Sequence, residues 1–168
     1  MFNAALRAGL FIASREPHFA PAAYVPVGMD ATVADDGLDF AFTNPFQHPV
    51  AVYTVVGANT VTTYILGNHA DTSTVTFETT HLQNLPHKII KKHDDSVTDD
   101  TLKQFGYDGH DITIRRTVTY SDGDRHIDLI TSHYDPTTPS STPDGDSEEV
   151  VSTADLQPQD PLLNALMT

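Results

Sequence analysis

The sequence predicts an α+β fold that is mostly β, with one N-terminal helix. Three observations lead to this prediction. Apolar residues recur at three- and four-residue steps from Phe2 to about Ser14, which is typical of an amphipathic helix. β-Branched and aromatic residues then fill short runs bounded by turn residues, among them residues 50–56 and 60–66. An Asp122-Gly123 pair lies between two further runs of this kind and favours a hairpin turn.

The predicted helix begins at Phe2 and ends before Pro17, because proline disfavours helix at its own position and at the residue before it. Its apolar stripe consists of Phe2, Leu6, Leu10 and Ala13. A glycine inside a helix costs roughly 1 kcal/mol relative to alanine, so Gly9 is expected to pack closely against another element.

An irregular stretch rich in proline follows from Glu16 to Gly37. Strands are then expected at Leu38 to Phe42, at 50–56 and at 60–66, joined by short turns that contain Asn, Pro and Gly. The sequence predicts that these three strands form a β meander.

A second β unit is expected from Thr74 to Tyr134. A two-residue turn at Asp122-Gly123 would pair Tyr120 with Arg125 and so fix the register of the hairpin. That register predicts one apolar face formed by Ile112, Ile114, Val118, Ile127 and Leu129. Arg116 interrupts this face, which leaves two possibilities: the side chain extends to the sheet margin, or it pairs with an acidic residue.

The chain is predicted to divide into segments 1–70, 71–136 and 137–168. From residue 137 onward there are six acidic residues, no basic residue and many prolines, serines and threonines, a composition typical of a mostly disordered tail. The last apolar residues, Leu162 to Met167, have helical spacing. They fit either a short docking segment or a frayed terminus.

Composition restricts the function. Nine basic residues against twenty-three acidic residues give a net charge of −14, which disfavours nucleic acids and anionic membrane surfaces as partners and suits neutral glycans or cationic partners better. The chain has no cysteine, so these residues contain no disulfide, thiolate metal site or cysteine nucleophile.

The apolar stretch from Ala8 to Ala13 is too short to span a bilayer, and no signal-peptide pattern precedes it.

Three residues of the irregular stretch are candidate site residues. His18 and Asp30 lie in one loop and form a possible base with its orienting acid, although no nucleophile is evident. The alternatives are that His18 orders the loop and that Asp30 caps backbone amides in a turn. Tyr24 is a candidate for stacking on a sugar ring, the alternative being that it packs on the sheet.

No metal site and no cofactor are expected. The cluster His93-Asp94-Asp95 with Asp99-Asp100 has oxygen ligands but no known binding-loop spacing. The tail imitates an EF-hand loop from Asp144, yet Glu149 stands where that loop requires glycine. None of the nine histidines has zinc-protease spacing, and no phosphate loop, Gly-x-Ser-x-Gly turn or dinucleotide fingerprint occurs.

Four stretches between Phe2 and Asn44 follow one another in the order and spacing of a known domain. They are Asn3-Ala4-Ala5-Leu6-Arg7-Ala8-Gly9-Leu10, His18, Tyr24-Val25-Pro26 and Gly28-Met29-Asp30-Ala31. This pattern resembles the second half of the VanW domain of bacterial cell-envelope proteins. In that family a glycine-rich Cys-Gln-Val-Ser segment comes before the helix, so the chain is expected to enter the domain in the middle of its helix.

The following β unit resembles the small extracellular module named for its five glycines, which often follows VanW domains. The matching features are Val75 to Thr79, Leu85-Pro86, Gly106 with Gly109, and Val118 to Gly123. Several expected glycines and a following proline-rich strand pair are altered.

These resemblances imply a protein of the cell envelope or the extracellular space, accessory to glycopeptide (vancomycin) resistance. Because the chain offers no nucleophile, the preferred function is a non-catalytic module that binds peptidoglycan or another surface glycan. The alternative is a truncated thiol enzyme of peptidoglycan modification, whose cysteine would lie upstream at a helix N-terminus that lowers its pKa. A third possibility is a nonproductive fragment with an exposed apolar face.

Overall fold

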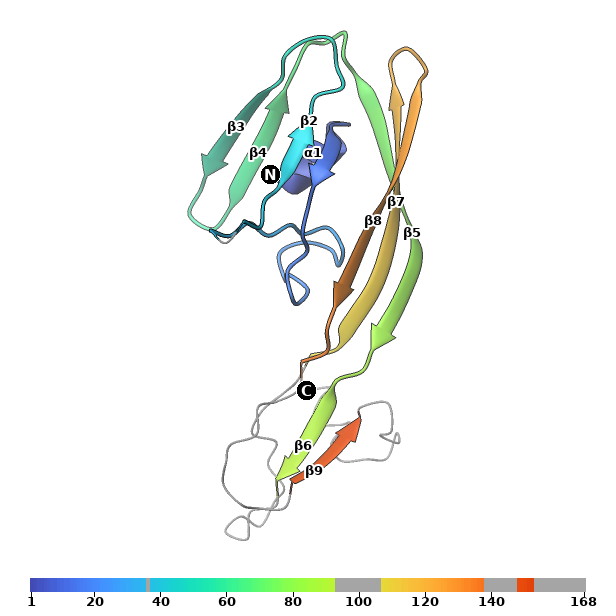
Figure 1. The fold of residues 1–168 in the computed structure, drawn as a ribbon. Coiled ribbons are helices and arrows are strands. Elements are labelled where there is room, and N and C mark those ends of the chain that lie inside the picture. The colour runs from blue at the N-terminus through green and yellow to red at the C-terminus, as the bar shows by residue number, and fades with distance from the viewer. Residues whose placement is uncertain (36, 93–106, 138–147, 153–168) are drawn as a thin grey trace.

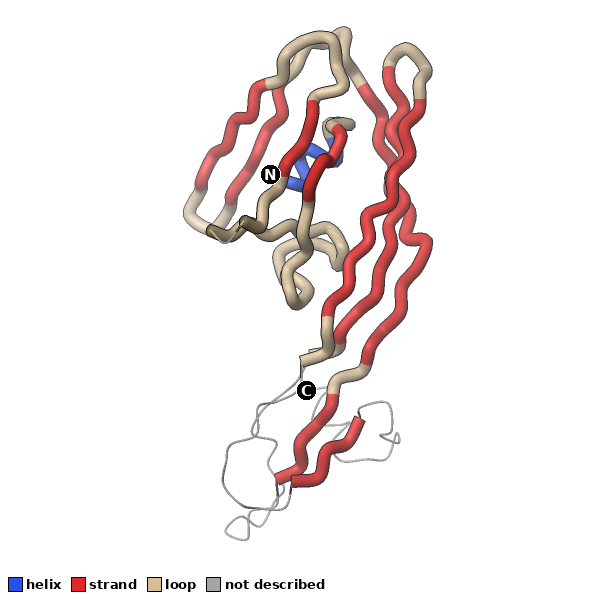
Figure 2. Tube along the Cα trace, viewed as in Figure 1, coloured by secondary structure: helices blue, strands red, loops and turns tan. Residues whose placement is uncertain are grey.

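The computed structural model describes residues 1–35, 37–92, 107–137 and 148–152. Within these ranges the chain is mostly β with one short helix, which confirms the predicted class (Figures 1 and 2). In chain order the elements are α1 (Phe2–Arg7), β1 (Phe11–Ser14), β2 (Ala41–Thr43), β3 (Ala51–Val56), β4 (Val61–Leu66), β5 (Ser73–Leu85), β6 (Lys88–Lys92), β7 (Gly109–Tyr120), β8 (Arg125–Tyr134) and β9 (Glu148–Ser152).

The described strands form four antiparallel sheets, ordered β1-β2, β3-β4, β5-β7-β8 and β6-β9. The three-stranded sheet is long, and α1 lies between it and the β3-β4 ribbon (Figure 1). The β6-β9 pair continues beyond the end of the long sheet that is farther from α1.

The prediction of a helix as far as Ser14 is wrong, because α1 ends at Arg7 and the last four residues of that segment form strand β1. Gly9 has a φ of +79°, the left-handed conformation that commonly ends helices. The expected close packing of Gly9 is confirmed, since a Cβ there would lie 2.6 Å from the Oγ of Ser73.

The predicted meander is also wrong, although two of its strands do pair. Strands β3 and β4 form the expected hairpin, from Ala51 opposite Leu66 to Val56 opposite Val61. The first of the three predicted strands, seen as β2, instead pairs with β1. The prediction failed because the partner of β2 lies in the segment that the sequence pattern assigned to the helix.

The predicted register of the β7-β8 hairpin is wrong by one residue. The N–H of Tyr120 donates to the carbonyl of Asp124 at 2.8 Å, and Gly123 has a φ of +92°. A three-residue loop with a left-handed glycine is the usual alternative to a two-residue turn. One extra loop residue turns every β8 side chain to the other face, so Leu129 and Ile127 are exposed rather than buried.

The shifted register explains the position of Arg116, whose side chain is fully buried and faces Asp128. Its Nε and Nη2 donate to the Asp128 carboxylate at 3.0 and 2.5 Å, so the ion-pair alternative is confirmed. Its Nη1 also donates to the carbonyls of Leu6 and Leu10 at 3.2 and 2.9 Å. A cation placed there stabilises the C-terminal end of α1, whose last carbonyls lack partners within the helix.

The hydrophobic core combines residues from both sides of residue 70. It consists of Phe2, Leu6, Met29, Ile112, Ile114, Ile130 and Tyr134. The helix and the 25–31 loop therefore pack directly on the long sheet, and the domain boundary at residue 70 stays a prediction.

Part of the predicted disordered tail is a strand, because Glu148–Ser152 pairs with Lys88–Lys92. The rest of that tail, at 138–147 and 153–168, lies outside the described residues, as does the acidic cluster at 93–100. None of the helical residues described forms a segment long and apolar enough to cross a membrane.

Candidate functional site

The loop between β1 and β2 is folded back on itself by backbone hydrogen bonds. The N–H of Thr32 donates to the carbonyl of Glu16 at 2.9 Å, and the N–H of Met29 donates to the carbonyl of Pro26 at 2.9 Å. Gly28 in this second turn has a φ of +83°, and a Cβ there would lie 3.0 Å from Ile112. Glycine at this position therefore lets the turn pack on β7 and directs Asp30 into the protein.

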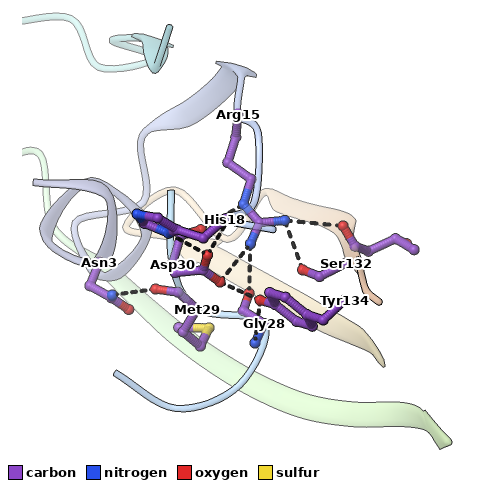
Figure 3. A network of polar contacts seen from close by, with 9 residues as sticks. Asn3, Arg15, His18, Gly28, Met29, Asp30, Ser132 and Tyr134 are labelled. Carbon is purple, nitrogen blue, oxygen red and sulfur yellow. Dashed lines mark hydrogen bonds and ion pairs between the residues drawn. The ribbon is translucent and has the colours of Figure 1, made fainter. Parts of the chain in front are cut away.

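The carboxylate of Asp30 is buried and accepts four hydrogen bonds (Figure 3). Its Oδ2 accepts from the backbone N–H and from Nδ1 of His18, at 2.7 and 2.8 Å. Its Oδ1 accepts from the hydroxyl of Tyr134 and from Nη2 of Arg15, the latter at 3.2 Å. Burial alone would raise the pKa of Asp30, but these hydrogen bonds and the Arg15 charge outweigh it and lower the pKa.

Arg15 connects this loop to β8. Its Nε donates to the Asp30 carbonyl at 2.7 Å, and its Nη1 donates to the Ser132 hydroxyl at 2.8 Å and to the Thr131 carbonyl at 3.1 Å. The guanidinium also lies over the ring of Phe2, 5.4 Å from its centroid. Asp30 belongs to the loop, whereas Thr131 and Ser132 belong to β8, so Arg15 holds the loop in one position against the sheet.

The hydroxyl of Tyr134 takes part in the hydrogen-bond network around Asp30 as both acceptor and donor. It accepts from the N–H of Gly28 at 3.0 Å and donates to Asp30. Burial, together with the hydrogen bond to Asp30, raises the pKa of Tyr134, so the phenol remains a neutral donor beside the carboxylate.

The ring of His18 is oriented by Asp30 and is partly exposed, at 31% of its side chain. Because Nδ1 faces an ionised carboxylate oxygen, we assign the proton of the neutral ring to Nδ1, which leaves a lone pair on Nε2. This is the arrangement in which a histidine acts as a general base. Among the described residues, however, no serine or threonine hydroxyl forms a hydrogen bond with this ring.

Two further histidines are held by an aspartate in the same way. His48 places its backbone N–H and Nδ1 on one Asp71 oxygen, at 3.1 and 2.9 Å. His87 does so with Asp108, at 3.0 and 2.7 Å. The His-Asp pair is therefore a repeated structural device here, and its presence at His18 does not by itself indicate catalysis.

Residues 1–66 match the family described as VanW like protein. The uncharacterized protein YoaR of Bacillus subtilis (strain 168) is 46% identical over 52 residues, which are 31% of this chain and 17% of YoaR. The chain thus spans a small part of this curated relative. No solved structure matches the fold.

The VanW-like region contains all three predicted site residues, and the structure brings them together. The ring of Tyr24 stands edge-on to that of His18, with centroids 6.4 Å apart. Tyr24 is 74% exposed and does not pack on the sheet, and Phe19, next to His18, is 85% exposed. The site therefore presents the ring of Tyr24 to solvent beside an oriented imidazole, and the loop exposes a second aromatic ring at Phe19.

Sequence reasoning missed Arg15, Phe19 and Tyr134. Phe19 could have been found as an aromatic residue in a polar loop next to His18. Tyr134 lies outside the VanW-like region, 104 residues from Asp30, and no local pattern indicates that contact. Arg15 lies at the junction of β1 and the loop, and β1 itself was not predicted.

Proposed function

We propose that this chain is a non-catalytic module of the cell envelope or extracellular space that binds peptidoglycan or another surface glycan. The VanW-like match of residues 1–66 supports the location. The exposed ring of Tyr24 beside the oriented ring of His18 is the observation that carries the binding role, and Phe19, the residue after His18, is exposed as well. An accessory place in glycopeptide resistance is proposed from the family resemblance alone.

The chemistry of sugars suits this surface. A pyranose ring has an apolar C–H face that packs on aromatic rings and hydroxyl edges that need hydrogen-bond partners. Tyr24 offers an apolar ring and a hydroxyl, and Nε2 of His18 offers an acceptor. Because Asp30 and Arg15 already hold the loop, binding orders few additional side chains and little affinity is lost to entropy.

We further propose that β5, β7 and β8 correspond to the five-glycine module, within the limits 71–136, and that residues 1–70 form the VanW-like unit. The Tyr134 and Arg15 hydrogen bonds join the two units through β8. On this proposal the second unit holds the glycan-binding loop in place through the contacts of β8 with Asp30 and Arg15.

Binding to insoluble peptidoglycan tests the proposal. The full chain should sediment with purified sacculi, and Tyr24→Ala should weaken binding about 2- to 10-fold, the effect of losing one aromatic contact of ~0.5–1.5 kcal/mol. Tyr107→Ala is the matched control, because Tyr107 is 70% exposed but lies outside this loop. Equal loss in both variants, or no sedimentation of the wild type, would contradict the proposal.

The alternative function is a thiol enzyme of peptidoglycan modification, in which His18, oriented by Asp30, would act as base for a cysteine that these 168 residues do not contain. A chain carrying the family's Cys-Gln-Val-Ser segment ahead of Met1 should then convert muropeptides in a thiol-dependent reaction that His18→Ala abolishes. Turnover that is absent, or unaffected by His18→Ala, counts against this alternative.

A further inference from the structure

The outer strand of the β3-β4 ribbon is exposed at every position from Ala51 to Val56. Its residues are apolar except Thr54, and Val56 is 75% exposed. The surrounding sequence from Phe40 to Ala70 contains no Asp, Glu, Lys or Arg, although the whole chain has a net charge of −14. The ribbon is therefore an uncharged, apolar surface on an acidic protein.

The edge of β3 also lacks the features that usually protect a sheet edge from pairing. Edge strands are commonly shielded by charged residues, proline, bulges or short length. Strand β5 has a bulge between Thr79 and His81, and β8 carries Arg125 and Asp128. Strand β3 has six residues, no charge and a regular register with β4. It forms the outer margin of the ribbon, with β4 on the side of α1 (Figure 1).

The direction of the backbone groups of β3 follows from its turn. The N–H of Gly57 donates to the carbonyl of Thr60 at 2.8 Å, so this pair is hydrogen-bonded. Hydrogen-bonded and non-hydrogen-bonded pairs alternate along antiparallel strands, and the two side chains of a non-hydrogen-bonded pair lie closer together than those of a hydrogen-bonded pair. Thr54 and Thr63 form a non-hydrogen-bonded pair, and their hydroxyls lie 3.2 Å apart. The N–H and C=O groups of Val52, Thr54 and Val56 therefore point outward, away from β4.

We propose that β3 pairs in antiparallel fashion with β3 of a second copy of this chain, with Thr54 opposite Thr54 of the other copy and Val52 opposite Val56. A two-fold axis normal to the sheet puts the same face of both copies on the same side of the combined sheet. Because side chains alternate between the two faces of a strand, opposing residues must then be identical or two or four positions apart. This register meets that requirement. It uses all the outward groups in about six backbone hydrogen bonds and converts two marginal ribbons into one four-stranded sheet.

The uncharged strand, whose outward groups match those of its own copy, favours a second copy as the occupant. Two chains of net charge −14 repel each other through most of their surfaces, but the ribbon brings no charged side chain opposite its own copy. The pairing also extends an existing apolar face, on which the rings of Tyr53 and Tyr64 stack at 6.3 Å. Burying such β-branched and aromatic side chains across strands stabilises the pairing.

A matched pair of proline variants tests this arrangement. Thr54→Pro removes an outward N–H from the proposed interface, whereas Thr63→Pro removes the equivalent outward N–H from the opposite edge of the ribbon. By analytical ultracentrifugation, the wild type and Thr63→Pro should be dimers at high micromolar concentration, and Thr54→Pro should be a monomer. Circular dichroism of both variants verifies that the β structure is retained.

Cross-linking tests the register without a destabilising change. The natural chain has no cysteine, so a single Thr54→Cys can form a disulfide only with another copy. The Cα atoms of a hydrogen-bonded antiparallel pair lie about 5.5 Å apart, within the roughly 4.4–6.8 Å span of disulfides. Mild oxidation should give a covalent dimer of Thr54→Cys and little of Thr119→Cys, a control on the long sheet.

Three results would overturn the proposal: a wild type that stays monomeric, a Thr54→Pro variant that still dimerises, or equal cross-linking at positions 54 and 119. A monomer that instead binds neutral lipid vesicles or another protein through the ribbon also counts against a second copy as the occupant.

Discussion

The hydroxyl of Tyr134 donates a hydrogen bond to the buried carboxylate of Asp30, although the two residues are 104 positions apart. This contact joins a loop of the VanW-like region to the last strand of the long sheet. The loop that carries His18 and Tyr24 therefore depends on residues beyond the matched region. Function of the loop and stability of the sheet should be affected together by changes at this contact.

Removing the Tyr134 hydroxyl tests this dependence. Tyr134→Phe leaves the N–H of Gly28 without an acceptor and removes one donor from Asp30, at a cost of about 1–3 kcal/mol in unfolding free energy. Urea denaturation measures the change. Tyr107→Phe, at an exposed tyrosine, should leave the unfolding free energy almost unchanged, and a similar effect in both variants would show that the buried contact is not the cause.

Asp30 should make stability depend on pH in the acid range. Its pKa in the folded protein lies below the ordinary value of 3.8, so the unfolded chain takes up its proton first as pH falls. The stabilisation is therefore complete above pH 3.8 and is lost as pH falls through the lowered pKa. Asp30→Asn should be less stable than the wild type at pH 7, and the difference should shrink at pH 3. A difference that is constant from pH 7 to pH 3 would contradict this account.

Adjacent arginines on β7 should differ sharply in importance. Arg116 is fully buried, and Arg116→Ala removes the cation paired with Asp128 and the donor to the Leu6 carbonyl at the end of α1, a loss of about 3–5 kcal/mol. Arg115 forms an exposed ion pair with Glu78, so Arg115→Ala should cost about 0–1 kcal/mol. Thermal and urea denaturation of both variants provide the comparison, and equal losses would refute the role of burial.

Local patterns in the sequence predicted some features well and others poorly, for physical reasons. The turn residues Gly57 to Asn59 specify the β3-β4 hairpin without tertiary help, and that hairpin is correct. The helical spacing of Phe2, Leu6, Leu10 and Ala13 extends the predicted helix into Phe11–Ser14, but the pairing of that segment with β2 overrides this preference. At Asp122-Gly123 two loop lengths fit the same residues, and the choice between them decides which face of β8 is buried.

The candidate site was predictable only where its residues lie close in sequence. His18 and Asp30 share one loop, so their proximity followed from that loop. Arg15 meets Ser132 and Thr131 across more than 100 positions, and such contacts depend on the docking of α1 and β1 on the long sheet. Nothing in the spacing of residues within either segment encodes that docking.

Gly28 allows backbone conformation and packing to be tested separately. Gly28→Ala combines strain at a φ of +83° with a Cβ only 3.0 Å from Ile112, so we expect a loss of about 2–4 kcal/mol. Gly37→Ala has a φ of +102° but no atom within 4 Å of its Cβ, so it should cost about 1 kcal/mol from strain alone. Because Gly28 directs Asp30 toward His18, Gly28→Ala should also weaken sedimentation with sacculi, whereas Gly37→Ala should not. Equal stability losses in the two variants would mean that the turn does not need to approach β7 closely.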